Sequence, residues 1–165
     1  MQGRVVGIYI ASGEGEPMQS RGEVRAIAGK GLEGDRYAIE AGKYSGTRID
    51  DAKRAVTLIE REAVQGAVAE FAVVLAEGET RRNLVTEGIR LNPLVGQEFT
   101  VGGVRMRGVD LSHPCVWLEE LTRPGVRVSL VDRGGLRADP RRRRHQARRP
   151  YPDPEHVTSV GHRLH

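Results

Sequence analysis

The apolar residues of this chain fall into short alternating runs separated by glycines, and this pattern limits the fold more than any other feature. Alternation over Arg4–Ile10 and Gly22–Ala28 has the period of a half-buried strand. Gly102-Gly103 separates two further strand-like runs, Phe99–Val101 and Val104–Val109, as in a hairpin. Short strands with glycine turns predict a mainly β fold with a few helices, arranged as a barrel or a sandwich.

One stretch has the spacing of an amphipathic helix. Its apolar residues recur at helical intervals, at Ile59, Ala63, Val64, Ala67, Val68 and Phe71. Thr57 and Glu60 are spaced as a capping box, in which each side chain binds the backbone of the other's turn. The sequence therefore predicts a helix over residues 58–72.

Charge is distributed unevenly along the 165 residues. The net charge is +4, yet the segment Arg137–His165 holds eight arginines against three acidic residues. The rest of the chain is close to neutral, so the high isoelectric point does not by itself predict nucleic-acid binding. The length fits one domain, which we place at residues 1–138. Residues 139–165 form a basic tail without apolar periodicity, and we expect this tail to be disordered.

No secretion or membrane signal is found in the sequence. The first ten residues pass directly into a strand pattern, without the basic and apolar regions of a signal peptide. No window approaches the roughly 18 apolar residues of a membrane span. The single cysteine, Cys115, cannot form an internal disulfide. We therefore expect a soluble cytoplasmic protein without membrane contact.

Cys115 opens a short helical pattern that ends near Leu121. Pro114 suits the first helical position, with Ser112 or His113 as the cap, so Cys115 would lie in the first turn. Free backbone N–H groups and the helix dipole favour an anion there, such as a thiolate. Two interpretations stay open from local context: a thiolate that binds metal or carries sulfur, and a buried inert cysteine that fills a small gap.

Two other clusters have residues suited to anion recognition. Arginine and asparagine side chains before a strand can bind phosphate or carboxylate by forked hydrogen bonds, and here they are Arg81, Arg82 and Asn83. On a strand the two arginines would point oppositely, so only one would face a ligand. The second cluster is a glycine-rich loop that lets backbone approach a ligand, with Gly34, Asp35 and Arg36. The alternatives are surface arginines and a plain turn.

These clusters, in this order, resemble the MOSC family, named for the C-terminal domain of molybdenum cofactor sulfurases. The matching pieces are G-L-E-G-D-R-Y at Gly31–Tyr37, A-V-T-L-I-E-R-E-A at Ala55–Ala63, T-R-R-N-L-V-T-E-G-I at Thr80–Ile89, L-N-P-L-V-G at Leu91–Gly96, P-C-x-x-L at Pro114–Leu118 and R-G-G-L at Arg133–Leu136. The resemblance runs from about Arg4 to Ala138 and is strongest to small stand-alone bacterial members.

The resemblance implies a β-barrel that binds a molybdenum cofactor of the molybdopterin type or carries sulfur. It makes Cys115 the catalytic thiolate, either as the metal ligand or as a persulfide carrier. It makes candidates for cofactor anchoring of Arg36, Arg81, Arg82, Asn83, Gly34 and Asp35. Pyridoxal phosphate binding is a further association of the family.

Three functions are compatible with this resemblance. The first is reduction of small N-hydroxylated compounds, which needs an external electron-donor protein because one cysteine cannot hold an iron–sulfur cluster. The second is a sulfur carrier that accepts sulfane sulfur on Cys115 from a cysteine desulfurase, for assembly of a metal–sulfur centre. The third is a non-catalytic binding module whose basic tail contacts acidic partners, although nucleic acid is not an expected partner.

Two features depart from the family pattern. Tyr37 stands where many relatives have a histidine, which bears on any proton-transfer role at that position. Members also continue after R-G-G-L-R-A with a further strand, whereas this chain changes character at Asp139-Pro140. We hypothesise a frameshift or truncation near Asp139, which would leave the C-terminal strand missing and a sheet edge unpaired. Translation of the other two reading frames past codon 138 tests this hypothesis.

Overall fold

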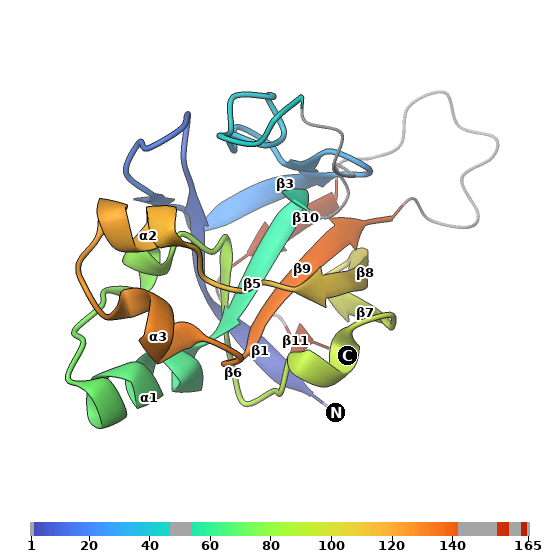
Figure 1. Cartoon of the computed structure of the whole chain (residues 1–165). Coiled ribbons are helices and arrows are strands. Elements are labelled where there is room, and N and C mark those ends of the chain that lie inside the picture. Colours follow the sequence, from blue (N-terminus) through green and yellow to red (C-terminus); the bar gives the residue numbers. More distant parts are fainter. Residues whose placement is uncertain (1, 47–53, 142–154, 159–162, 165) are drawn as a thin grey trace, which may run out of the picture.

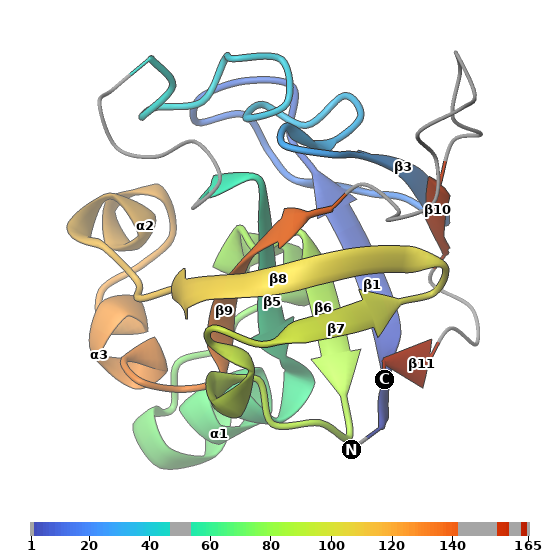
Figure 2. The ribbon, with the colours of Figure 1, turned by 90° about the vertical axis from the view of Figure 1, so that its right-hand side faces the viewer.

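The computed structural model describes residues 2–46, 54–141, 155–158 and 163–164, and it contains a curled β-sheet with three short helices along one side (Figures 1 and 2). The strands are β1 Gly3–Ile10, β2 Gln19–Ser20, β3 Glu23–Ile27, β4 Gly31–Leu32, β5 Val56–Glu60, β6 Leu84–Glu87, β7 Glu98–Val101, β8 Val104–Leu111, β9 Gly135–Pro140, β10 Glu155–Thr158 and β11 Arg163–Leu164. The helices are α1 Arg61–Phe71, α2 Val116–Leu121 and α3 Val126–Leu130, with 3-10 turns η2 Glu77–Thr80 and η3 Asn92–Leu94. The predicted mainly β fold with few helices is confirmed.

The main sheet has the strand order β11-β7-β8-β9-β5-β6-β1-β2. Its neighbours are antiparallel except β5 and β6, which are parallel and joined through α1. β11 pairs with both β7 and β1, so it links these two strands, which lie near opposite ends of the strand order (Figure 2). β10, β3 and β4 form a smaller sheet beside it. The predicted hairpin is confirmed, because Val101 pairs with Val104 across Gly102-Gly103.

Two apolar clusters cover the two faces of the central strands. One fills the inside of the curled sheet and includes Leu58, Leu84 and Leu136. The other lies between the sheet and the helices and includes Ile59, Val85 and Leu118. All five residues of β5 are buried, because this strand is covered on both sides. The strand β5 is therefore held at the centre of the fold. Its burial also positions the segment that follows β5 and the segment that precedes β6.

The helix predicted over residues 58–72 is correct only from Arg61 onward. Residues 56–60 form β5, since an apolar run buried on both faces has no strand alternation and cannot be told from a helix by periodicity. The predicted capping box is wrong. Thr57 lies within the strand and bonds Asn83, while the Glu60 carboxylate accepts the backbone N–H of Leu91.

The chain continues as strand beyond the expected boundary at Ala138, since β9 runs to Pro140. β10 pairs with β3, and β11 pairs with β1 and β7. Residues 155–158 and 163–164 of the expected tail therefore lie in strands, while the tail boundary and the frameshift hypothesis stay predictions. The sequence argument considered only apolar burial, whereas backbone pairing at open sheet edges also orders a chain. Residues 142–154, 159–162 and 165 of the expected tail lie outside the described residues.

None of the helices in the described part of the chain is long and apolar enough to span a membrane.

Ending the chain at Arg141 tests whether the last strands belong to the fold. We expect the free energy of unfolding to fall by about 2 kcal/mol or more, because each lost hydrogen bond contributes about 1 kcal/mol net. Urea denaturation of the full and shortened chains measures this difference. Equal stability of the two chains would contradict the pairing of β10 and β11.

Candidate functional site

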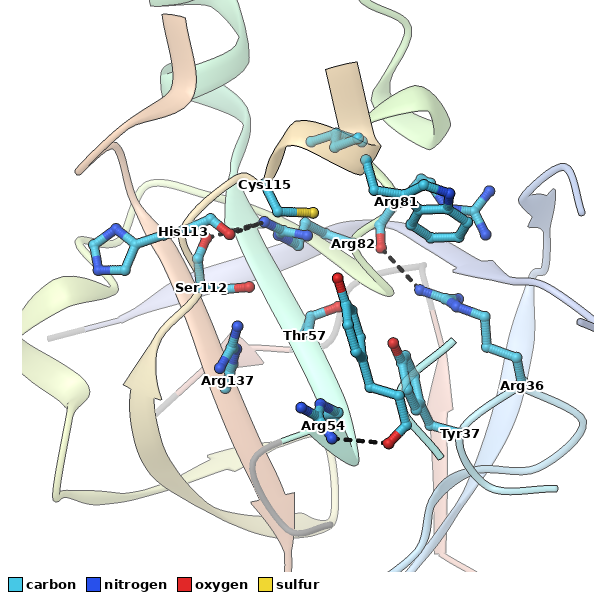
Figure 3. Close-up of a pocket in the computed structure, with 13 residues that line it drawn as sticks. Arg36, Tyr37, Arg54, Thr57, Arg81, Arg82, Ser112, His113, Cys115 and Arg137 are labelled. Carbon is cyan, nitrogen blue, oxygen red and sulfur yellow. Dashed lines mark hydrogen bonds between the residues drawn. The ribbon is translucent and has the colours of Figure 1, made fainter. Parts of the chain in front are cut away.

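A cavity of about 280 Å³ opens beside Cys115, and its charged side chains are all basic. Five arginines line it, contributed by distant parts of the sequence: Arg36, Arg54, Arg81, Arg82 and Arg137. The other lining residues are three aromatic residues, one histidine and four small or apolar residues. They are Tyr37, Tyr44 and Trp117, His113, and Thr57, Ser112, Cys115 and Leu118. No Asp or Glu of the described residues lines this cavity, which we call the basic pocket (Figure 3).

Cys115 is exposed and lies at the N-cap of α2, directly before its first residue Val116. The alternative of a cysteine buried in a small gap is therefore wrong, whereas its reactivity stays a prediction. The placement of Pro114 at the first helical position is also wrong, because Pro114 precedes the cap. Its fixed φ leaves it compatible with the extended chain that leads into the helix. The sulfur is thus accessible from the basic pocket.

A buried hydrogen-bond cluster holds the pocket's framework together. The Asn83 amide donates to Tyr9 O and to Asp35 Oδ1, at 3.1 Å each. Its oxygen accepts the Thr57 backbone N–H and the Thr57 hydroxyl, at 3.0 Å each. Asn83 thereby joins β1, β5 and the glycine-rich loop at one point, since a side-chain amide can both donate and accept.

Asp35 is fully buried and extends this cluster toward the pocket. It accepts backbone N–H groups from Ala11 and Tyr37, and it pairs with the Arg36 guanidinium at 3.1 Å. Arg36 also donates to the backbone oxygen of Arg81. The predicted set therefore divides: Arg36 lines the basic pocket, whereas Gly34, Asp35 and Asn83 do not line it. Asp35 and Asn83 orient the residues that do.

Arg81 and Arg82 both line the basic pocket, so the expectation that only one would face a ligand is wrong. Strand alternation does not apply to them, because Arg81 follows η2 with a φ of 57° and β6 begins only at Leu84. Arg81 donates to Glu16 O at 2.7 Å. Arg82 donates to the backbone oxygens of Ser112 and His113, which ties it to the segment that carries Cys115.

Three guanidinium nitrogens of these two arginines are buried without a hydrogen-bond partner in the described part of the chain. They are Arg81 Nε, Arg81 Nη2 and Arg82 Nε. A buried donor without a partner costs free energy, so such groups favour an acceptor in the pocket, either water or a bound ligand. Guanidinium groups match the planar oxygens of phosphate and carboxylate.

Burial and the positive charges of neighbouring arginines disfavour the charged form of both Arg81 and Arg82. Burial lowers the pKa of Arg82 to about 10, and the positive charge of Arg137 contributes to the decrease. Burial lowers the pKa of Arg81 as well, assisted by the charge of Arg36. Arg82 is still protonated at neutral pH. A bound anion would offset this repulsion, because an opposite charge stabilises the cation.

Aromatic side chains line the pocket beside these charges, and no local sequence motif marked most of them. The Arg81 guanidinium lies 5.5 Å and Lys43 Nζ lies 4.4 Å from the Trp117 ring centre. Burial raises the pKa of the Tyr44 phenol, and the adjacent Cys115 sulfur raises it further. Tyr44 therefore keeps its proton at neutral pH and offers a hydroxyl beside the sulfur.

Three further residues of the pocket were assigned other roles from the sequence or none. Arg137 entered only the charge count of the C-terminal segment, but it lies on β9 opposite Thr57 of β5. Thr57 was predicted to cap a helix. Arg54 precedes β5, donates to the Tyr44 backbone oxygen and lies 4.9 Å from the Tyr44 ring centre. Strand pairing brings these residues together, and no local motif encodes it.

The pocket adjoins a second hollow, and its histidine faces another way. A hollow of about 280 Å³ shares Tyr37 and Arg54 with the basic pocket. The His113 ring points away from Cys115, and its Nδ1 lies 3.3 Å from Asp132 Oδ1 (Figure 3). Among the residues with defined placement, no group of three His, Cys, Asp or Glu could hold a metal ion.

Comparison with known proteins relates the whole arrangement to one family. A model described as MOSC domain matches residues 32–147. The crystal structure of YuaD from Bacillus subtilis superposes with a TM-score of 0.75 at 17% identity, over 99% of this chain and 94% of that one. YiiM from Escherichia coli gives 0.61 at 20% identity, over 99% and 68%. YiiM from Geobacillus stearothermophilus gives 0.62 at 11% identity, over 99% and 74%. No curated protein matches the sequence.

Replacing Asn83 with Ala tests the buried cluster. We expect the free energy of unfolding to fall by about 3 kcal/mol, because the change leaves Asp35 and the Thr57 backbone with unsatisfied buried groups. Gln97→Ala removes an exposed amide and should change stability by less than about 0.5 kcal/mol. Chemical denaturation compares the variants. Equal effects of the two substitutions would show that the cluster does not support the fold.

Proposed function

The chain belongs to the MOSC domain family. We therefore propose that the basic pocket binds a molybdenum cofactor of the molybdopterin type, and that the protein uses this cofactor to reduce small N-hydroxylated compounds. The observation that carries this proposal is the pairing of an exposed thiol, Cys115, with buried guanidinium donors that lack acceptors. Such a cofactor presents a metal that soft thiolates bind and a phosphate that arginines bind.

The side chains of the pocket fit the separate parts of the cofactor. Arg81 has two unpartnered buried N–H groups, on Nε and Nη2, which suit two phosphate oxygens. Arg36 lies beside Arg81 and lowers its pKa, so a phosphate here would relieve the repulsion between them. Trp117, Tyr37 and Tyr44 supply flat apolar surface for the pterin ring.

Cys115 would be the protein ligand of the metal. When bound, the cofactor supplies a redox-active metal that accepts electrons and delivers them to the substrate. The polypeptide's part is to fix the sulfur at the mouth of the pocket and to surround it with hydrogen-bond donors. The protonated Tyr44 hydroxyl beside Cys115 is placed to donate a hydrogen bond to a group bound at the sulfur. Electrons would come from a separate donor protein, and we place this activity in the cytoplasm.

Replacing Cys115 with Ala tests this function. Wild-type protein, expressed in cells that make the cofactor, should contain about one molybdenum per chain, and the variant about tenfold less, because the thiolate ligand is lost. Elemental and pterin analysis measure both, with circular dichroism to confirm folding. Gln97→Ala, an exposed position outside the basic pocket that keeps the thiol, is the control. Well-folded wild type without molybdenum or pterin would contradict the proposal.

The exposure of Cys115 also favours a second candidate, a sulfur carrier. In this role the sulfur would accept sulfane sulfur from a cysteine desulfurase and pass it to a metal–sulfur centre under assembly. Incubation with a desulfurase and cysteine should then add the mass of about one sulfur atom to the wild type and nothing to Cys115→Ala. Intact-protein mass spectrometry detects the adduct. Wild type that gains no mass would exclude this candidate.

A further inference from the structure

The basic pocket has more cationic groups than one phosphate requires, and they are divided between two places. Asp35 pairs with Arg36 at 3.1 Å and partly neutralises the side where Arg36 and Arg81 lie. Arg137 lies on the opposite side of the pocket from these two arginines (Figure 3). A single phosphate that binds the Arg36 and Arg81 side therefore leaves Arg137 without an anion.

Arg82 shares this second side with Arg137. Its guanidinium donates to the oxygens of Ser112 and His113, directly before the segment that carries Cys115. Its Nε is buried and has no acceptor among the described residues. The charge of Arg137 lowers the pKa of Arg82, which places the two cations within electrostatic reach of each other. In the described part of the chain neither arginine forms an ion pair with a carboxylate.

Asp110, the acidic residue nearest in strand register, forms no ion pair with Arg137 among the described residues. It pairs with Arg137 across β8 and β9, but its Oδ1 accepts the Leu111 backbone N–H. Two guanidinium groups that face a cavity without a carboxylate repel each other, and an anion between them stabilises both charges. The Thr57 hydroxyl, next to Arg137 across β5 and β9, is committed to Asn83 and leaves the arginines as the donors.

We propose that Arg82 and Arg137 form a second anion subsite, which binds a carboxylate or phosphate group of the substrate beside Cys115. This proposal rests on the proposed function, because it assigns the other side of the pocket to the cofactor phosphate. It makes the substrate a small anionic N-hydroxylated compound. Neutral analogues would bind in the same pocket without this contact.

Calorimetric titration of the cofactor-free full-length chain with inorganic phosphate tests the subsite itself. Wild type should bind about two phosphates, and Arg137→Gln about one, because a charged donor pair is lost at the second subsite. Arg107→Gln removes an exposed arginine from β8 outside the pocket and should still bind two. Acetate in place of phosphate distinguishes the preferred group: competition at the Arg137-dependent subsite indicates a carboxylate. Wild type with one phosphate, or Arg137→Gln with two, would overturn the proposal.

Turnover of the cofactor-loaded protein tests the substrate class. An aryl amidoxime with a carboxylate should have a kcat/KM about tenfold or more above that of its neutral parent, since hydrogen bonds to charged groups contribute about 1.5–3 kcal/mol. Arg137→Gln should abolish this preference and Arg107→Gln should retain it. A preference for the neutral compound would contradict the anionic substrate. Loss of cofactor binding would refute the proposed function alone, because the phosphate titration uses cofactor-free protein.

Discussion

The hydrogen bonds of Asn83 are the interaction on which the pocket depends. This one buried amide binds the β1 backbone, the Thr57 backbone and hydroxyl on β5, and the Asp35 carboxylate in the glycine-rich loop. Asp35 then fixes Arg36, and the turn before Asn83 fixes Arg81 and Arg82. Each bond is made inside the fold, where an unsatisfied partner is costly, so the cluster orders several loops together.

The charge pattern of the pocket follows from this framework. Arginines that a flexible surface would leave solvated are held in a cavity, where burial lowers the pKa of Arg81 and Arg82. The fold therefore holds several arginines that repel one another next to an exposed thiol. Anion binding would offset that repulsion. The residues before the C-terminal segment have a net charge close to zero, yet the fold gathers several arginines in this one site. Among the described residues of the segment Arg137–His165, Arg137 lines this site.

Sequence patterns predicted the β architecture and brought Cys115, Arg36, Arg81 and Arg82 to attention, because alternation, glycine turns and ordered motifs are local signals. They failed where tertiary contacts decide the outcome. Thr57 was assigned to a helix cap because a strand buried on both faces lacks alternation. Arg137, Tyr44 and Trp117 were not recognised as pocket residues. Only strand pairing and loop packing bring these side chains to Cys115.

The proposed function requires a metal at the Cys115 sulfur and a phosphate against Arg81, at two defined points of one cavity. Diffraction at the molybdenum absorption edge, from crystals of protein loaded with cofactor, locates the metal directly. We expect an anomalous peak adjoining Cys115 Sγ, with phosphate density against the Arg81 guanidinium. An anomalous peak elsewhere on the protein, or a phosphate remote from Arg81, would contradict it.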